Sequence, residues 1–245
     1  MKREPAFNIP PVIVAVLAVL VIVHVVRVYV LTPAQDNAML WLFAFNPMRY
    51  GGLLPAAALP GGFGAKIWTF LTYALLHASW IHLGVNAIWF LPFGTAVARR
   101  FGPARFLIFF AVAAVAGAIA HMLSYAGQNA PVIGASAAIS GTMAGAMRFA
   151  FQRGGPLNFW RTGGEPDYRV TALPLSRVLF EPAVLIFILV WFGINLLFGL
   201  GSLPLTGLGV GEVVAWQAHI GGFLAGLFLF SWFDPYADDR RVTQH

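Results

Sequence analysis

The chain has 245 residues, of which 59% are hydrophobic and only 10% are charged, whereas soluble domains carry roughly 25% charged residues. This composition excludes an ordinary soluble domain and indicates an integral membrane protein. The absence of cysteine excludes disulfides and thiolate metal sites. The formal net charge of +6 is dispersed over loops without a nucleic-acid-reading motif, so we expect loop charges that orient the protein in a membrane and no nucleic-acid partner.

The first apolar segment covers residues 11–31 and is long enough to cross a hydrocarbon core of about 30 Å. We assign residues 1–10 before it to a cytoplasmic N-terminus. No convincing small-x-small cleavage site follows the segment, so we expect an uncleaved span and not a signal peptide. His24 and Arg27 lie in its second half. We expect His24 to be packed and Arg27 to extend to the nearer membrane surface.

The composition changes between residues 32 and 80, where prolines are frequent and five glycines lie between Gly51 and Gly64. This region is too broken by proline and glycine to be one span. It is also too aromatic to be an ordinary disordered linker. We therefore expect a loop embedded in the membrane interface, with short amphipathic helices.

Five further apolar segments follow and bring the number of expected spans to six: residues 81–98, 104–125, 132–151, 181–200 and 211–233. The only long polar connection between them, residues 152–180, is too short to form a separate domain. The sequence therefore predicts an all-α membrane protein with a six-transmembrane-helix domain over residues 11–233. Residues 234–245 form the expected cytoplasmic C-terminal tail.

The basic residues predict how these spans are oriented. With a cytoplasmic N-terminus, twelve lysines and arginines fall on the cytoplasmic side, and only Arg49 and Lys66 fall on the other, with Arg27 set aside. Six spans return the C-terminus to the cytoplasm. No organelle-targeting segment is visible, which favours the plasma membrane of a bacterium.

This orientation brings four polar side chains to one depth in the membrane. His82 and Asn86 lie in the first turns of the second span, Ser136 in the first turns of the fourth, and His219 about two turns into the sixth. At 1.5 Å per residue, all four lie roughly 5 to 13 Å below the outer surface. Polar groups in hydrocarbon are costly, so their agreement in depth indicates a functional site.

The chemistry of these residue types suggests acyl transfer. A serine becomes a good nucleophile when a base accepts its proton, and histidine is the usual base. We therefore predict a dyad of Ser136 and His219 without a carboxylate, and we keep Ser140 as the alternative nucleophile. His82 and Asn86 share one helix face and can donate to an oxyanion, as can the Ser136 backbone N–H at the start of its helix. We expect no metal site and no cofactor.

Glycines on the fourth and sixth spans provide a reason for the two helices to meet. Gly141 and Gly145 form one small-xxx-small pair, and Gly222 and Gly226 form another. Such pairs let helix backbones approach closely in membranes. Close approach of these two helices would bring Ser136 and His219 within hydrogen-bonding distance.

Three blocks of the chain resemble the rhomboid family of intramembrane serine proteases, over residues 68–233. They are the segment from Trp68 to Asn86, the tripeptide Gly134-Ala135-Ser136, and the segment from Ala218 to Gly226. The resemblance implies a six-helix bundle with an interfacial first loop. It also implies Ser136 as nucleophile, His219 as general base, and His82 and Asn86 in the oxyanion hole. The resemblance further implies a water-filled cavity that is open to the outer face. A substrate helix would enter this cavity sideways, near spans two and five.

The family motif is Gly-x-Ser-Gly, and here Ala137 replaces its second glycine. We predict a serine-type endopeptidase that hydrolyses single-span transmembrane proteins near the outer leaflet through an acyl-enzyme. The first alternative is a catalytically inactive rhomboid-like protein that binds membrane clients. The second, a secondary transporter, would show inverted repeats and a polar layer at the membrane midplane, and the sequence shows neither.

Overall fold

The computed structural model describes residues 9–52, 58–157, 167–199 and 215–236, and all named elements in these ranges are helical, as the composition predicted. The elements are α1 (Pro11–Val25), which continues as a π-helical turn (Val26–Val30), α2 (Pro33–Phe43), α3 (Gly62–Thr72), α4 (Trp80–Phe101), α5 (Pro103–Ser124), α6 (Ser136–Met147), α7 (Leu175–Val178), α8 (Pro182–Gly199) and α9 (Trp216–Phe233). Short 3-10 turns, Pro47–Tyr50 and Tyr73–Leu75, lie before and after α3.

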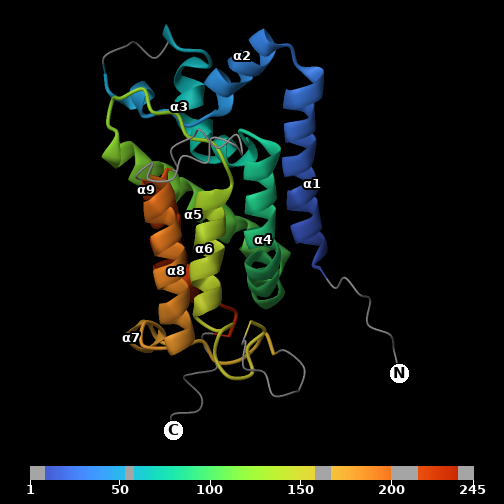
Figure 1. The fold of residues 1–245 in the computed structure, drawn as a ribbon, viewed down its shortest axis with the longest axis vertical. Helices are drawn as coiled ribbons and strands as arrows, with labels where there is room; N and C mark the ends of the chain where they lie inside the picture. Colours follow the sequence, from blue (N-terminus) through green and yellow to red (C-terminus); the bar gives the residue numbers. More distant parts are fainter. Residues whose placement is uncertain (1–8, 53–57, 158–166, 200–214, 237–245) are drawn as a thin grey trace.

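The short helix α6 forms the centre of the bundle (Figure 1). It packs against α4, α5 and α9, and all of its residues after Ser136 are buried. Its 12 residues correspond to a length of about 18 Å, which is less than the thickness of a hydrocarbon core. α1 packs against α4, and α8 contacts α9. The helix that begins with Ser136 is therefore enclosed by other helices of the bundle.

The expected fourth span, residues 132–151, is thus longer than the helix that forms. Residues 131–135 do not join the helix because Val132 makes a bridge with Phe45 and Gly134 has a φ of 120°, which favours glycine. At the other end the Arg148 carbonyl accepts a hydrogen bond from the Leu173 N–H at 2.6 Å. The sequence pattern predicted which segment is apolar. The ends of the helix within that segment are set by long-range backbone contacts.

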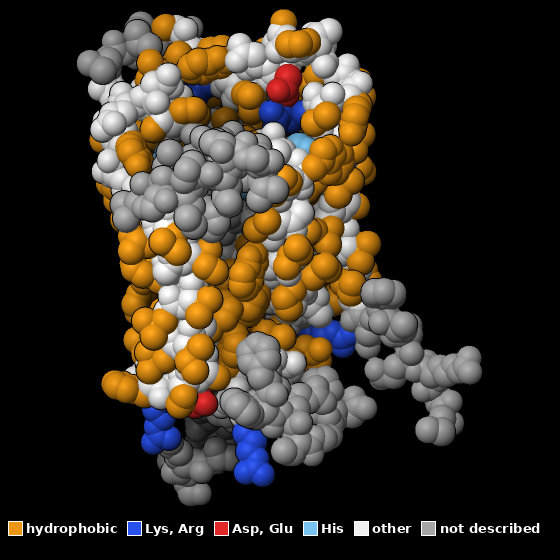
Figure 2. All heavy atoms as spheres, viewed as in Figure 1, with side chains coloured by type: hydrophobic (Ala, Val, Ile, Leu, Met, Phe, Trp, Pro, Cys, Tyr) orange, Lys and Arg blue, Asp and Glu red, His pale blue; other side chains and the backbone are white. Residues whose placement is uncertain are grey.

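Among the described residues, three helices are long and apolar enough to cross a membrane: Pro11–Val30, Trp80–Phe101 and Pro103–Ser124. A shorter apolar helix, Pro182–Leu197, corresponds to the expected fifth span. The expected sixth span is represented by α9, and residues 211–214 at its predicted start lie outside the described ranges. Figure 2 shows hydrophobic side chains over the middle of the molecule, with most of the visible lysine and arginine side chains at its lower end. The chain is a multi-pass membrane protein.

The region expected as an interfacial loop, residues 32–80, forms α2 and α3 in its described part, and both lie across one end of the bundle (Figure 1). α2 begins with a capping box, in which Thr32 and Gln35 each bond the backbone N–H of the other. On α3, Phe63, Ile67 and Leu71 recur at a spacing of four residues and are all exposed. This apolar stripe fits a helix lying in a membrane interface.

Arg27 does not extend to the membrane surface as its position in the first span suggested. Its guanidinium pairs with the Asp36 carboxylate, at 2.7 Å from Nε, and donates to the His77 carbonyl at 2.7 Å. These contacts join the end of α1 to α2 and to the loop before α4. His24 is buried, as expected, with its ring edge-on to Trp80 at 4.6 Å between centroids.

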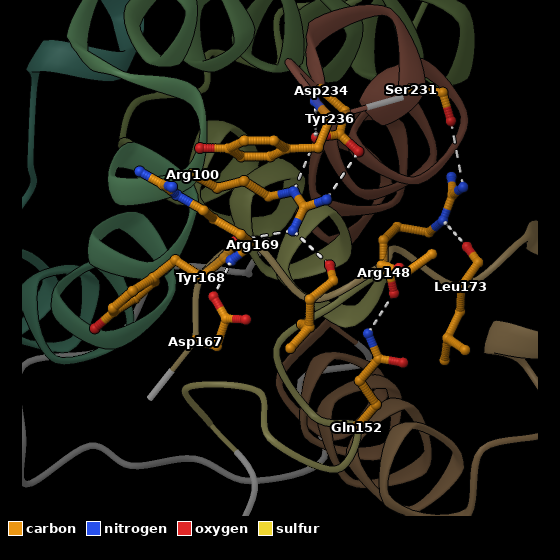
Figure 3. A network of polar contacts seen from close by, with 12 residues as sticks. Arg100, Arg148, Gln152, Asp167, Tyr168, Arg169, Leu173, Ser231, Asp234 and Tyr236 are labelled. Carbon is orange, nitrogen blue, oxygen red and sulfur yellow. Dashed lines mark hydrogen bonds and ion pairs between the residues drawn. The ribbon is translucent and has the colours of Figure 1, made fainter. Parts of the chain in front are cut away.

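A second polar network joins the opposite ends of α4, α6 and α9 (Figure 3). Arg100 forms a buried ion pair with Asp234 at 2.9 Å and also donates to two backbone carbonyls, those of Tyr168 and Val170. Arg148 is also buried and donates to the carbonyls of Leu173 and Leu227. The expectation that the basic residues are dispersed loop charges is therefore wrong for Arg100 and Arg148, which connect the described part of residues 152–180 to the bundle.

Candidate active site

Ser136 is the first residue of α6, and the segment before it is fixed on both sides. Val132 and Phe45 exchange backbone hydrogen bonds of 2.8 and 3.2 Å, and the Gly134 N–H donates to the Tyr73 carbonyl at 3.0 Å. The Tyr73 hydroxyl donates to the Ala114 carbonyl of α5 at 2.8 Å, and burial raises its pKa above the ordinary range. The serine is therefore held at a helix start whose backbone N–H groups have no intrahelical acceptor.

His219 lies in the first turn of α9, and its Nε2 is 2.7 Å from Ser136 Oγ. The glycines explain why the two helices come so close. A Cβ added to Gly222 would lie 2.0 Å from the Ala137 carbonyl oxygen, and one added to Gly226 would lie 2.1 Å from the Gly141 carbonyl oxygen. The predicted close approach of these helices is confirmed, and it brings the serine and the histidine into direct contact.

Ser140, the alternative nucleophile, occupies a different environment. It is buried one turn into α6, and its hydroxyl donates to the Ser136 carbonyl at 2.8 Å. This is a local bond that serine commonly makes inside a helix. The contact with His219 belongs to Ser136.

His82 approaches the same point from α4. A Cβ built on Gly134 would lie 2.8 Å from His82 Nε2 and 3.7 Å from Ser136 Oγ, so both polar atoms surround one small space. The other ring nitrogen, Nδ1, faces the Ala78 N–H at 3.5 Å, a weak contact in which the ring nitrogen accepts.

Asn86 lies one turn beyond His82 on the same face of α4 and is buried. Its side-chain nitrogen has no hydrogen-bond partner among the described residues. A buried donor without an acceptor is rare in folded proteins and calls for an explanation. The Asn86 amide is therefore a candidate hydrogen-bond donor to a bound group.

The structure adds one residue that the sequence analysis missed. Asn195, buried on α8, contacts His219 Nδ1 through its side-chain oxygen, while its side-chain nitrogen donates to the Trp191 carbonyl at 2.8 Å. The available signal was that Asn195 is the only amide or ionisable side chain between Pro182 and Gly199. A polar side chain within such an apolar helix is a functional candidate by default.

Two other described histidines, His121 and His77, make no hydrogen bond to Ser136 or His219, although the His77 ring lies 5.1 Å from the His82 ring between centroids. His121 Nε2 contacts the Ala130 carbonyl at 2.8 Å at the end of α5. His77, in the loop before α4, is fully buried, and neither of its ring nitrogens has a hydrogen-bond partner in the described part of the chain. Burial, with a smaller effect from His82, lowers the pKa of His77 to about 3. No three metal-ligating side chains gather among the described residues.

The chain is similar to known proteins over most of its length. The Rhomboid domain model matches residues 64–234, which contain all of the residues discussed above from His77 to Asp234. The chain is 26% identical over 190 residues to rhomboid-like protease 3 of Toxoplasma gondii, covering 76% of this chain and 59% of the relative. It is 24% identical over 217 residues to rhomboid protease GlpG of Yersinia pestis, covering 88% of this chain and 61% of the relative. The chain thus spans about three fifths of the length of these two relatives.

Proposed function

Because this chain belongs to the rhomboid family, we propose that it is an intramembrane serine endopeptidase in which Ser136 and His219 form the catalytic dyad. The observation that carries the proposal is the 2.7 Å contact between Ser136 Oγ and His219 Nε2. It joins a hydroxyl and an imidazole from two different helices of a membrane bundle. Such a pair is the minimal arrangement for activating a serine.

The proposed reaction begins when Ser136 Oγ attacks the carbonyl carbon of the scissile peptide bond and transfers its proton to His219 Nε2. His219 then returns this proton to the leaving amine as the C–N bond breaks, which leaves an acyl ester on Ser136. Water, deprotonated by the same imidazole, hydrolyses the ester and restores the serine. The half-buried positions of Ser136 and His219 are compatible with water reaching both groups.

We assign the oxyanion hole to the backbone N–H of Ser136 and the side chains of His82 and Asn86. The N–H belongs to the first residue of α6, where the helix supplies no acceptor. His82 Nε2 borders the same small space as Ser136 Oγ, and the Asn86 side-chain nitrogen is buried without a hydrogen-bond partner among the described residues, which supports the assignment. Oxyanion holes stabilise the charge that develops in a transition state through donors that are positioned before the reaction, and we propose this role for these three groups.

The proposed substrates are single-span transmembrane proteins, cleaved near the outer leaflet. A fully hydrogen-bonded helix does not expose its carbonyls, so the cleaved segment should contain small or helix-breaking residues. We further propose six spans, with both termini in the cytoplasm of a bacterium. The excess of basic residues on one side of the predicted spans supports this orientation.

Labelling with a fluorophosphonate in liposomes tests the proposal directly, because the reagent reacts with an activated serine. We expect the full chain to be labelled at Ser136 and to cleave a model transmembrane substrate. Ser136→Ala and His219→Ala should abolish both, while Ser140→Ala should retain both. A folded chain that neither reacts nor cleaves, but still binds the substrate, would support the inactive client-binding alternative. A label on Ser140 would refute the choice of Ser136.

A further inference from the structure

Asn195 is the polar side chain on α8 that faces the proposed catalytic histidine. Its side chain is buried, and the rest of α8 from Pro182 to Gly199 carries no other amide or ionisable group. On α8 the exposed side chains include Ile186, Leu189, Val190, Ile194 and Leu197, which are all aliphatic. The one polar group of this helix is thus directed inward, at His219 on α9.

The hydrogen bonds around Asn195 fix which way its amide points. The side-chain nitrogen donates to the Trp191 carbonyl, which can only accept, so the side-chain oxygen is the atom that faces His219. An amide oxygen can only accept as well. His219 Nδ1 must therefore carry a proton, and in the neutral imidazole Nε2 then has the free lone pair. That lone pair faces the Ser136 hydroxyl.

We propose that Asn195 is a positioning residue that holds His219 in the tautomer able to accept the proton of Ser136. This inference rests on the proposed function and adds a third member to the dyad. The amide also fixes the plane of the imidazole, because the ring is bonded on both nitrogens. When Nε2 gains the proton, the Asn195 oxygen continues to accept from Nδ1–H, and this bond becomes charge-assisted.

A neutral amide suits this position better than a carboxylate. An unpaired negative charge within a membrane helix is costly, whereas a neutral amide avoids this cost and still accepts one hydrogen bond. The aromatic contacts of α8 also hold Asn195 in place, because Trp191, one turn earlier, stacks on Phe223 of α9 at 4.8 Å between centroids. Asn195 and Trp191 thus contact α9 from successive turns of α8.

Substitutions that preserve the shape of the side chain separate positioning from packing. Asn195→Leu keeps the number and branching of the side-chain heavy atoms but removes the acceptor, and we expect kcat to fall roughly 10-fold to 100-fold, with KM unchanged. Asn195→Asp keeps an acceptor and adds charge. It should retain more activity than Asn195→Leu and move the acidic limb of the pH profile of kcat to higher pH. Leu196→Ala, on the lipid-exposed side of the same helix, should leave kcat unchanged.

A purely structural role predicts the opposite order. A buried charge destabilises a membrane helix more than leucine does, so Asn195→Asp would then be the less active variant, in step with a lower midpoint of thermal unfolding. Equal kcat and equal pH profiles for Asn195→Leu and the wild-type chain would also overturn the proposal.

A spectroscopic measurement keeps this inference separate from the proposed function. In ¹⁵N-histidine NMR of the full chain, with His219→Gln used to assign the signal, we expect His219 to be protonated at Nδ1 in the wild type. In Asn195→Leu we expect a mixture of tautomers. If the wild type neither cleaves nor reacts with fluorophosphonate, the proposed function fails. If His219 keeps the Nδ1–H tautomer in Asn195→Leu, the role of Asn195 fails instead.

Discussion

The imidazole of His219 is bonded to a hydroxyl on one side and to an amide on the other, and the three residues come from three different helices. Ser136 lies at the start of α6, His219 at the start of α9 and Asn195 near the end of α8. Each bond alone is a common contact between polar side chains. Together they orient a neutral histidine so that its basic nitrogen faces the one hydroxyl that it is proposed to activate.

The oxyanion donors can be tested one residue at a time. We expect His82→Ala and Asn86→Ala each to lower kcat by about tenfold or more, because each removes a proposed donor to the charge that would develop next to Ser136. The kinetics of cleavage of a model transmembrane substrate in liposomes provide the measurement. Val85→Ala is the matched control, since this side chain is exposed on another face of α4. Unchanged kcat for both variants would exclude these side chains from the oxyanion hole.

His77 makes the stability of the fold depend on pH. Its pKa is about 3 in the folded chain and 6.5 in a model peptide, so below pH 6.5 the unfolded chain binds a proton that the folded chain does not. The stability from this group is complete above pH 6.5 and falls as the pH drops toward 3. Between pH 7 and pH 5 we expect a loss of about 2 kcal/mol. Thermal unfolding in micelles at both pH values measures it.

The matched variant is His77→Phe, which keeps a ring but cannot bind a proton. It should reduce the loss of stability on acidification by the contribution of His77. Other groups surround this ring, namely His24, His82 and Arg27, so some dependence on pH should persist. If this variant lost as much stability between pH 7 and pH 5 as the wild-type chain does, His77 would not be a source of the pH dependence.

Residue patterns predicted Ser136, His219, His82 and Asn86 as one site, because a shared depth and a serine next to glycines are visible along the chain. They did not predict Asn195. A single amide in an apolar helix has no spacing that identifies its partner, and the partner here lies 24 positions further along the chain. Only the packing of α8 on α9 shows which group it meets.

The helices α6 and α9 depend on backbone contact, because two glycines of α9 touch carbonyl groups of α6. We expect Gly226→Ala to destabilise the fold by about 1 to 3 kcal/mol, since the added methyl group would lie 2.1 Å from the Gly141 carbonyl oxygen. Gly193→Ala on α8 is the control, because nothing lies within 4 Å of its added methyl group. It should be neutral or slightly stabilising. Equal thermal unfolding midpoints for the two variants would show that the close contact between α6 and α9 does not determine the stability of the fold.

Most of the apolar helices could be predicted from hydropathy, as α1, α4, α5 and α8 show. The length of α6 could not. Its sequence is apolar from Val132 to Phe151 apart from a few small polar residues and Arg148, but the bridge between Val132 and Phe45 removes the first turn. Hydropathy reports the environment of a segment, and it does not distinguish a lipid-facing helix from one enclosed by other helices.

At the scale of the whole molecule, the described residues include one polar network at each end of the bundle, around Arg27 at one end and around Arg100 at the other. The ion pair of Arg100 and Asp234 has no exposed side-chain surface. We expect Asp234→Asn to destabilise the fold by roughly 3 to 5 kcal/mol, because it leaves a buried guanidinium without its carboxylate. Chemical unfolding in mixed micelles measures this effect. Asp167→Asn, an exposed aspartate in the same region, should change the free energy of unfolding by less than about 0.5 kcal/mol. Similar free energies of unfolding for the two variants would mean that the buried ion pair contributes little to the stability of the fold.

The position of Asn195 on α8 has a consequence for the order of events during turnover. α8 is held to its neighbours by side-chain contacts such as Trp191 on Phe223 and Phe187 on Trp89. Any outward movement of α8 that separates it from α9 also withdraws the amide from His219, and the freed ring can then rotate or exchange its proton. With α8 displaced, the proposed base would lose the contact that orients it. In the proposed reaction, proton transfer from Ser136 would then require α8 to be packed against α9.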